Sequence, residues 1–323
     1  MNRCKGFTLP ELAIAFVIIA LLLAGALVPL STQLEVRNVA DTRRIMDQVR
    51  DAIIGFAQAN GRLPCPARGQ TASGSLDTVT WGLAIAAGAE QYDVMNKRCY
   101  TVLGVVPWST LGVPETDAWG RRFTYRVSPA FADDPQSATL KTWSSTQSLA
   151  GPPALPPPQT VTNITSPQNQ NPACDPSASP PTQSSFALCS LGDIAVFTRN
   201  ESKSPLTPTA IGAGLPAVFI SHGRNGYGAW QPSGTRVLGA NDTDGDGVPD
   251  QNADEAANVT GTSTLTPTGG YLSYAFYSRN PTPFAGTCSD TTAAGPYCEF
   301  DDIIVMIPPS TLMARMISAG RLP

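Results

Sequence analysis

Lys5-Gly6-Phe7-Thr8-Leu9-Pro10-Glu11 leads directly into Leu12–Leu30, a segment without a charged side chain. An apolar run longer than about 18 residues is a candidate membrane-spanning helix, because about 20 residues at a rise of about 1.5 Å cross the hydrocarbon core of a bilayer. A secretory signal peptide has a shorter apolar core, followed by a small-residue cleavage site. Here the glycine lies before the apolar run, after a short basic leader. Cleavage after Gly6 would therefore leave the helix attached to the mature chain.

This order of basic leader, glycine, aromatic residue, glutamate and apolar run resembles the N-terminus of the type IV prepilin family, which includes type IV pilins and the pseudopilins of type II secretion. The resemblance implies that a prepilin peptidase cuts between Gly6 and Phe7, and that Phe7 is then methylated. Pro10 departs from the family, which more often has an aliphatic residue there. Proline is tolerated in the first turn of a helix, where its missing N–H would be unpaired in any case.

Glu11 would be the fifth residue of the mature chain. A carboxylate at the edge of an apolar helix is costly at bilayer depth, so such residues usually mark function. The family resemblance implies that Glu11 pairs with the N-terminal amine of a neighbouring subunit as a filament assembles. The alternative is an interfacial charge that reaches the lipid headgroups.

The cysteines indicate where the body of the chain resides. Cys4 would leave with the leader, and the remaining six form an even set: Cys65, Cys99, Cys174, Cys189, Cys288 and Cys298. The absence of CxxC spacing, together with a single histidine, argues against a zinc site. An even set fits disulfides in an oxidising compartment, and we predict sequential pairing. Basic residues on both sides of the apolar run leave its orientation undecided by charge. The cysteines favour a periplasmic head and a cytoplasmic N-terminus across the inner membrane.

The helical pattern continues beyond the apolar run, through residues 31–60. Apolar residues recur there at three-, four- and seven-residue steps: Val39, Met46, Val49, Ile53 and Phe56. The pattern stops at Asn60-Gly61, with Pro64 just beyond. We expect one helix of about 50 residues, its first half in lipid and its second half against a domain; Pro29 should bend it, and two separate helices are the alternative.

The remaining chain predicts an α+β, pilin-like fold in which the long helix packs on an antiparallel β-sheet with long loops. Five runs rich in Val, Ile, Phe and Tyr predict strands of a single antiparallel sheet: residues 122–127, 193–199, 217–222, 271–277 and 302–307. Residues 310–319 predict a short terminal helix. The proline-rich insertion at 148–185 predicts a long surface excursion. We therefore divide the chain into a leader (1–6), an apolar helix (7–30), an amphipathic continuation (31–60) and a head (61–323).

Two segments of the head carry a second resemblance. Asp117-Ala118-Trp119-Gly120-Arg121-Arg122-Phe123-Thr124-Tyr125 is similar to the DPWG segment that enters the sheet of the major type II secretion pseudopilin. Phe219-Ile220-Ser221-His222-Gly223-Arg224-Asn225-Gly226 resembles that family's strand and glycine-rich loop, which hold a calcium ion. Asn225 replaces an aspartate, although an amide oxygen can still coordinate. The implied ligands are Ser221, Asn225, Glu255 and Asp302, with Asp254 and Asp301 as further candidates.

An acidic insertion, Asp242-Thr243-Asp244-Gly245-Asp246-Gly247-Val248-Pro249-Asp250, precedes Asp254. Carboxylates on alternate residues converge on one cation if the chain turns sharply, which Gly247 permits, and hard oxygen ligands suit calcium. The insertion resembles the loops of EF-hands and thrombospondin type 3 repeats. The implied ligands are the side chains of Asp242, Asp244, Asp246, Asp250 and Asp254 and the carbonyl of Val248. Because no helical pattern flanks the insertion, we expect a calcium-stapled loop rather than an EF-hand; the alternative is a solvated acidic turn without metal.

The chain predicts assembly rather than catalysis. His222 is the sole histidine and lies in a glycine-rich turn, so we expect no enzyme; no basic cluster indicates nucleic-acid binding. A bulky head favours a minor pilin or pseudopilin of a type IV pilus or type II secretion pseudopilus. Its expected partners are other pilin subunits, the prepilin peptidase, the inner-membrane assembly platform and, before assembly, membrane lipid. The alternatives are a filament-tip adhesin or substrate-binding module on the same anchor, and a membrane-tethered enzyme.

Overall fold

The computed structural model describes residues 9–77, 84–94, 98–133, 185–237, 253–265 and 272–322, apart from six single positions: 187, 189, 205, 284, 286 and 294. Several predicted features lie outside these residues. They are the cleavage site at Gly6 and Phe7, the proline-rich insertion, the acidic loop at 242–250, Cys174 and Cys189.

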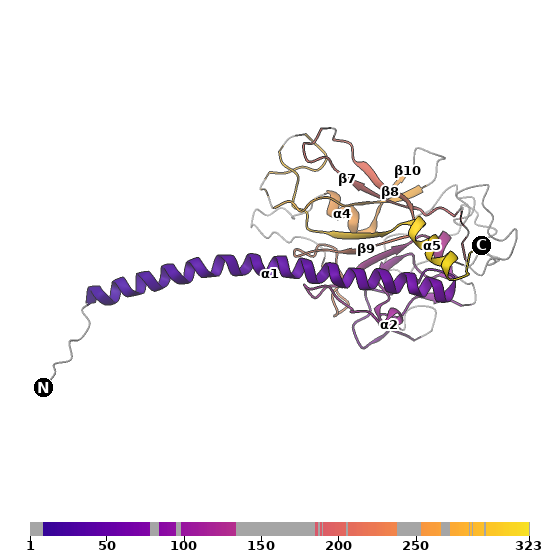
Figure 1. Ribbon diagram of the computed structural model, residues 1–323, viewed down its shortest axis with the longest axis horizontal. Coiled ribbons are helices and arrows are strands. Elements are labelled where there is room, and N and C mark those ends of the chain that lie inside the picture. Colours follow the sequence, from indigo (N-terminus) through magenta and orange to yellow (C-terminus); the bar gives the residue numbers. More distant parts are fainter. Residues whose placement is uncertain are drawn as a thin grey trace.

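The helix α1 (Leu9–Asn60) is a single element of 52 residues. Its N-terminal half projects from the head, and its C-terminal half lies along one side of it (Figure 1). The predicted end at Asn60 is confirmed. Gly61 follows with a φ of 73°, in the left-handed region that glycine adopts readily, and its N–H donates to the carbonyl of Ala57 at 2.8 Å. Pro29 does not divide α1 into two helices.

The two halves of α1 differ in what their apolar side chains contact. Met46, Val49 and Ile53 are fully buried in the head. From Leu9 to Ile19, in contrast, the large apolar side chains are between 48% and 89% exposed. Measured over the described residues alone, helix length and hydropathy identify no membrane-crossing helix.

One four-stranded sheet is antiparallel throughout and has the order β12-β9-β6-β5. Its strands are β5 (Leu103–Val105), β6 (Thr124–Val127), β9 (Ala217–Ser221) and β12 (Ile303–Ile307). We call it the first sheet. Because β12 and β5 end the order, each has a single strand neighbour among the described residues.

A second four-stranded sheet has the order β10-β11-β7-β8. Its strands are β7 (Ile194–Thr198), β8 (Thr209–Leu215), β10 (Thr262–Leu265) and β11 (Leu272–Tyr277). In this second sheet β11 runs parallel to β7, whereas the other pairs are antiparallel. The expected strands form, but the expectation of a single antiparallel sheet was wrong. Similar apolar runs belong to two sheets, and one pair is parallel.

The head has three layers, with the first sheet between α1 and the second sheet. Side chains of β9 alternate between the two interfaces: Phe219 packs in the core that includes Met46, and Ile220 packs with Phe276 of β11. All five residues of β9 are buried. A strand covered on both faces is a continuous apolar run, as the sequence Ala217–Ser221 largely is.

Short elements complete the head. The helix α5 (Pro309–Ser318) matches the predicted terminal helix and lies beside the end of α1 (Figure 1). The others are β1 (Leu76–Asp77) paired with β2 (Ile85–Ala86), β3 (Tyr92–Asp93) paired with β4 (Arg98–Cys99), α2 (Trp108–Leu111) and α3 (Pro129–Ala132).

Two disulfides form between consecutive cysteines, as sequential pairing predicts. Cys65–Cys99 joins the segment after α1 to β4, and Cys288–Cys298 closes a loop before β12. Cys65 and Cys99 are buried in the core against α1. This disulfide therefore links the first residues of the head to β4 within the core that packs against α1.

Candidate metal centre

The helix α4 (Ala253–Thr260) begins three residues beyond Asp250 and packs against β11. The sequence led us to expect no helix beside the acidic loop, and that expectation was wrong. Two consecutive carboxylates, Asp254 and Glu255, occupy the first turn of α4, and both are fully buried. Because successive helical residues point in different directions, the two carboxylates enter different surroundings.

Asp254 belongs to an ion-pair cluster. Arg199 donates from Nε and Nη2 to its carboxylate at 2.8–2.9 Å, and Arg279 Nε lies 3.0 Å from Asp254 Oδ2. Arg279 also pairs with Asp290 at 3.2 Å. A calcium ion in the acidic loop would have to draw Asp254 away from two buried guanidinium groups.

Glu255 faces two further carboxylates from the segment before β12. Ligand oxygens of Glu255, Asp301 and Asp302 lie within 4.8 Å of one another. The N–H of Asp301 donates to Glu255 Oε1 at 2.9 Å, and Asn225 Nδ2 donates to Glu255 Oε2 at 3.0 Å. Asn258 Nδ2 donates to Asp302 Oδ2 at 2.8 Å. We call these three acidic residues the carboxylate cluster.

Two oxygens of the carboxylate cluster accept no hydrogen bond from the described residues. Asp301 Oδ1 and Asp302 Oδ1 are buried without a hydrogen-bond partner; His222 Nδ1 lies 3.3 Å from Asp302 Oδ1 but is not aligned for a bond. Burial and the neighbouring carboxylates raise the pKa of Glu255 to about 10, and they raise the pKa of Asp301 to about 7. Three carboxylates so close together need either protons or a cation.

The donor set fits a calcium ion. Calcium takes oxygen ligands from carboxylates, amides and backbone carbonyls, and tolerates irregular geometry. The structure brings together Glu255, Asp302 and Asn225 from the predicted second site, with Asp301, which was a further candidate from the sequence. Asn225 Oδ1 accepts the N–H of Tyr227 at 3.0 Å. Asn225 therefore links Glu255, through its Nδ2, to the backbone of the glycine-rich loop.

Ser221 does not join this cluster. Its hydroxyl donates to Asp117 Oδ2 at 2.6 Å, and Asp117 Oδ1 accepts the N–H groups of Trp119 and Arg121 at 2.9 Å. The guanidinium of Arg121 donates to the carbonyl of Gly223 at 2.8 Å. The two segments with the pseudopilin resemblance therefore contact each other, and Ser221 supports the loop rather than an ion.

His222 also serves the interior. Its Nε2 lies 2.8 Å from the hydroxyl of Thr124, and its Nδ1 lies 3.3 Å from Asp302 Oδ1. The hydroxyl, imidazole and carboxylate are therefore in the order of a catalytic triad. Thr124 is 3% exposed and His222 is fully buried. A substrate cannot reach the hydroxyl in this arrangement, so we assign these residues to the packing between the sheets.

The N-terminal site begins with Glu11, which lies in the first turn of α1. Residues 1–27 match the family model of the prokaryotic N-terminal methylation motif. This match includes the basic leader, Gly6, Phe7, Glu11 and most of the apolar run, and it shows a prepilin-type signal. No curated protein and no solved structure gave a match to the chain. The resemblance of the head to the major pseudopilin therefore stays a prediction.

Proposed function

We propose that this chain is a minor pilin-like or pseudopilin-like structural subunit of a type IV pilus or type II secretion pseudopilus. The methylation motif carries the proposal, because it leads directly into a long helix whose N-terminal half projects from the head (Figure 1). A prepilin peptidase cuts after Gly6 and exposes Phe7 for methylation. Glu11 then pairs with the N-terminal amine of a neighbouring subunit.

The projecting half of α1 serves two environments in this proposal. Burying apolar surface contributes about 25 cal/mol per Å², so the exposed side chains of Leu12, Ile14 and Phe16 favour removal from water. Lipid of the inner membrane covers Leu12–Leu30 before assembly, with the head in the periplasm. Helices of other subunits replace the lipid when the assembly platform inserts the subunit into a filament.

The head binds calcium in this proposal, through Glu255, Asp301 and Asp302. Support comes from the two buried carboxylate oxygens without partners and from a donor set that suits a hard cation. The acidic loop Asp242–Asp250 is proposed as a second calcium site on its sequence alone.

Processing and assembly are tested in cells that carry a prepilin peptidase and an assembly system. Mass spectrometry of the purified chain should show loss of residues 1–6 and one methyl group on Phe7. Glu11→Ala should be processed yet be at least tenfold depleted from sheared filaments, whereas Glu35→Ala on the same helix should assemble normally. Normal incorporation of Glu11→Ala would remove the assembly role of this residue, and an uncut chain would overturn the proposed function.

Calcium binding is tested by titration calorimetry and thermal unfolding of the chelator-treated chain. A ligand present at about 100 times its dissociation constant stabilises the folded state by about 2.7 kcal/mol. Glu255→Gln should abolish the response at the carboxylate cluster, because it removes a carboxylate ligand. It should also stabilise the chelated chain, because folding no longer has to protonate a buried carboxyl whose pKa is raised to about 10. Asp244→Asn should affect the acidic loop only. If calorimetry of the unmodified chain detects no heat of calcium binding, both proposed sites are wrong. If Asp244→Asn abolishes the heat of binding and Glu255→Gln does not, the ion binds in the acidic loop and not at the carboxylate cluster.

A further inference from the structure

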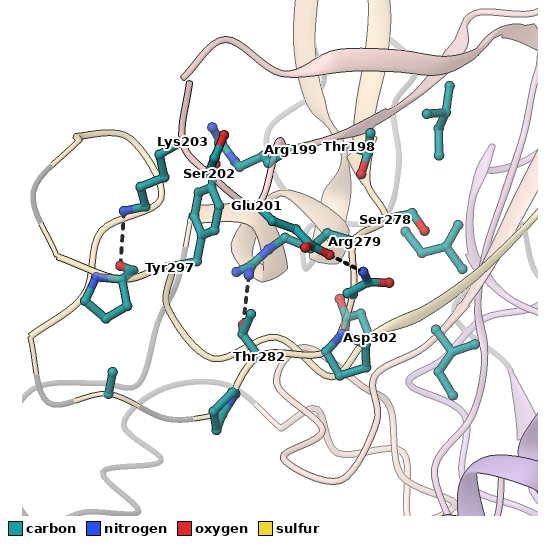
Figure 2. Close-up of a pocket in the computed structure, with 18 of the residues that line it drawn as sticks. Thr198, Arg199, Glu201, Ser202, Lys203, Ser278, Arg279, Thr282, Tyr297 and Asp302 are labelled. Carbon is teal, nitrogen blue, oxygen red and sulfur yellow. Dashed lines mark hydrogen bonds between the residues drawn. The ribbon is translucent and has the colours of Figure 1, made fainter. Parts of the chain in front are cut away.

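A groove runs along the flank of the head where its three layers meet. Its cavity has a volume of about 1250 Å³. Arg43 and Asp47 of α1 line it, as do Ile211 of β8 and three consecutive residues of β12, 303–305. Figure 2 shows its other wall, where Lys203 and Tyr297 approach from the loops after β7 and before β12.

The groove follows the outer edge of β12. Ile303 and Val305 pack toward α1, whereas Ile304 packs toward the second sheet. Consecutive side chains on opposite faces of a strand can line one cavity only if the cavity passes along the strand's edge. The other edge of β12 is occupied by β9, so the groove lies at the edge that has no strand neighbour among the described residues, which we call the free edge.

Backbone groups along that edge have no strand partner among the described residues. In an antiparallel pair, alternate residues direct their N–H and C=O groups away from the partner strand. Among the described residues, no hydrogen bond reaches residues 303–307 from any strand except β9. All but Ile307 are half-buried, so the groups face the groove rather than a dry interior. The edge is about 17 Å long at about 3.4 Å per residue.

The walls of the groove restrict what can pair with this edge. Because α1 lines the groove on one side and β8 on the other, we expect it to admit a single extended segment rather than a whole sheet from another molecule. The volume exceeds the range of about 300–1,000 Å³ that is typical of small-molecule pockets. An extended peptide can use the unpaired groups for hydrogen bonds and place alternate side chains against Ile303 and Val305.

The charges at the groove favour an acidic segment. Arg43 is exposed and has no carboxylate partner among the described residues, because the neighbouring Asp47 pairs with Arg50 at 3.0 Å. Lys203 Nζ donates to three backbone carbonyls of the loop before β12, those of Ser289, Thr292 and Pro296, and it forms no ion pair with the described residues. Glu201 also lines the groove, where its Oε1 accepts a hydrogen bond from Asn280 Nδ2. Carboxylates on an incoming segment would complement both cations.

We propose that this groove binds an extended acidic segment of another protein chain, which adds to the free edge of β12 as an extra strand. The site is a property of the head and does not depend on filament assembly. It shares one lining residue, Asp302, with the carboxylate cluster. It makes the head a receptor for a partner's tail or loop.

The test uses the full chain in detergent micelles and a labelled synthetic peptide of alternating valine and threonine with an aspartate at each end. Fluorescence anisotropy should show saturable binding. Hydrogen exchange should slow at alternate backbone amides of residues 303–307, as expected for a strand added to β12. The same peptide with a central proline, or with lysine at its ends, should bind at least tenfold more weakly.

Arg43→Glu should weaken binding about tenfold, and Arg44→Glu is its matched control, since Arg44 is exposed on the same helix but does not line the groove. Equal weakening by the two variants would indicate general charge attraction and overturn the proposal. Binding that leaves exchange at β12 unchanged, or no binding at millimolar peptide, would also overturn it. So would protection of β12 that grows with protein concentration in the absence of peptide, because a second copy would then occupy the groove.

Discussion

The carboxyl of Asp133 lies in the interior beside the Cys65–Cys99 disulfide, where it accepts the N–H of Cys99 at 2.8 Å. It is 3% exposed. Burial raises the pKa of Asp133 from 3.8 to about 7, and the hydrogen bond from Cys99 offsets only part of this rise. At this residue, protonation and folding are therefore linked.

The sign of this linkage is testable. An acid with a higher pKa in the folded state binds its proton more tightly when folded, so the free energy of unfolding falls as pH rises between about 4 and about 7. Asp133→Asn keeps an oxygen acceptor for Cys99 but has no charge to bury. In urea titrations at pH 4.5 and pH 8, the unmodified chain should lose on the order of 3 kcal/mol more than Asp133→Asn. Asp51→Asn, on the exposed side of α1, is the control; equal pH dependence in all three chains contradicts the linkage.

The adjacent residues Asp254 and Glu255 show what the sequence could and could not predict at the candidate site. Glu255 and Asp302 were predicted as ligands from the family resemblance, and the structure brings them together. Asp254 was a candidate for both the acidic loop, because it follows Asp250 closely in the chain, and the second site. Only the start of α4 at Ala253 decides which carboxylate turns toward Arg199 and which toward Asp301. No spacing in the sequence reveals a contact between residues 46 positions apart.

At the scale of elements, α4 is held by buried polar contacts on both sides. Asp254 binds Arg199 and Arg279, while Asn258 donates to the carbonyl of Tyr277 and accepts its N–H, at 2.9 and 2.7 Å. The guanidinium groups also stack on aromatic rings, with Arg199 5.1 Å from the ring of Tyr277. This network fastens α4 to the second sheet.

Removing one partner of this network should destabilise the head. Asp254→Ala leaves two buried guanidinium groups uncompensated, and breaking a buried ion pair in this way costs about 3–5 kcal/mol. Asp51→Ala removes an ion pair with Arg50 whose aspartate side chain is 72% exposed, and should change stability by less than about 1 kcal/mol. Urea denaturation measures both. A loss below about 1 kcal/mol in Asp254→Ala would show that the cluster does not anchor α4.

The two described disulfides should differ in their response to a reductant. Cys65 and Cys99 are 0% and 3% exposed, whereas Cys288 lies at the surface and Cys298 is 8% exposed. Exchange requires a thiolate to reach a sulfur atom, so access controls the rate. Mild reduction followed by thiol labelling and peptide mass spectrometry should label Cys288 and Cys298 first. Labelling of Cys65 and Cys99 should require unfolding; equal rates under native conditions would contradict this difference in access.

Elements were predictable where a local pattern exists. The five predicted strands form because each concentrates β-branched and aromatic residues between turn signals, and α1 ends where Gly61 follows Asn60. The strand β8 was missed because its sequence, Thr209–Leu215, is rich in glycine and alanine. The parallel pairing of β7 with β11 has no local signal, since it joins segments about 80 residues apart. Sheet membership is decided by contacts that the sequence does not display.

At the scale of the whole molecule, α1 divides the chain into two parts with different roles. At Thr42 the helix contacts the head. Thr42 is fully buried, and its hydroxyl accepts a hydrogen bond from the N–H of Ala118 at 3.2 Å. From Met46 onward the helix supplies part of the core. Between Leu9 and Ile19 the large apolar side chains are 48–89% exposed. Stability should therefore reside in the C-terminal half of α1, and insertion and assembly in the N-terminal half.

Deletion of residues 1–34 tests this division. The shortened chain should dissolve without detergent and unfold within about 3 °C of the full chain, because no core residue is lost. Ile53→Ala should cost about 2–5 kcal/mol in either chain, since Ile53 is fully buried. Ile14→Ala, at a side chain that is 61% exposed, should leave the unfolding of the head in the full chain unchanged. If the head fails to fold after the deletion, the N-terminal half of α1 contributes to its stability. The division of α1 into a stabilising half and a half for insertion and assembly would then be wrong.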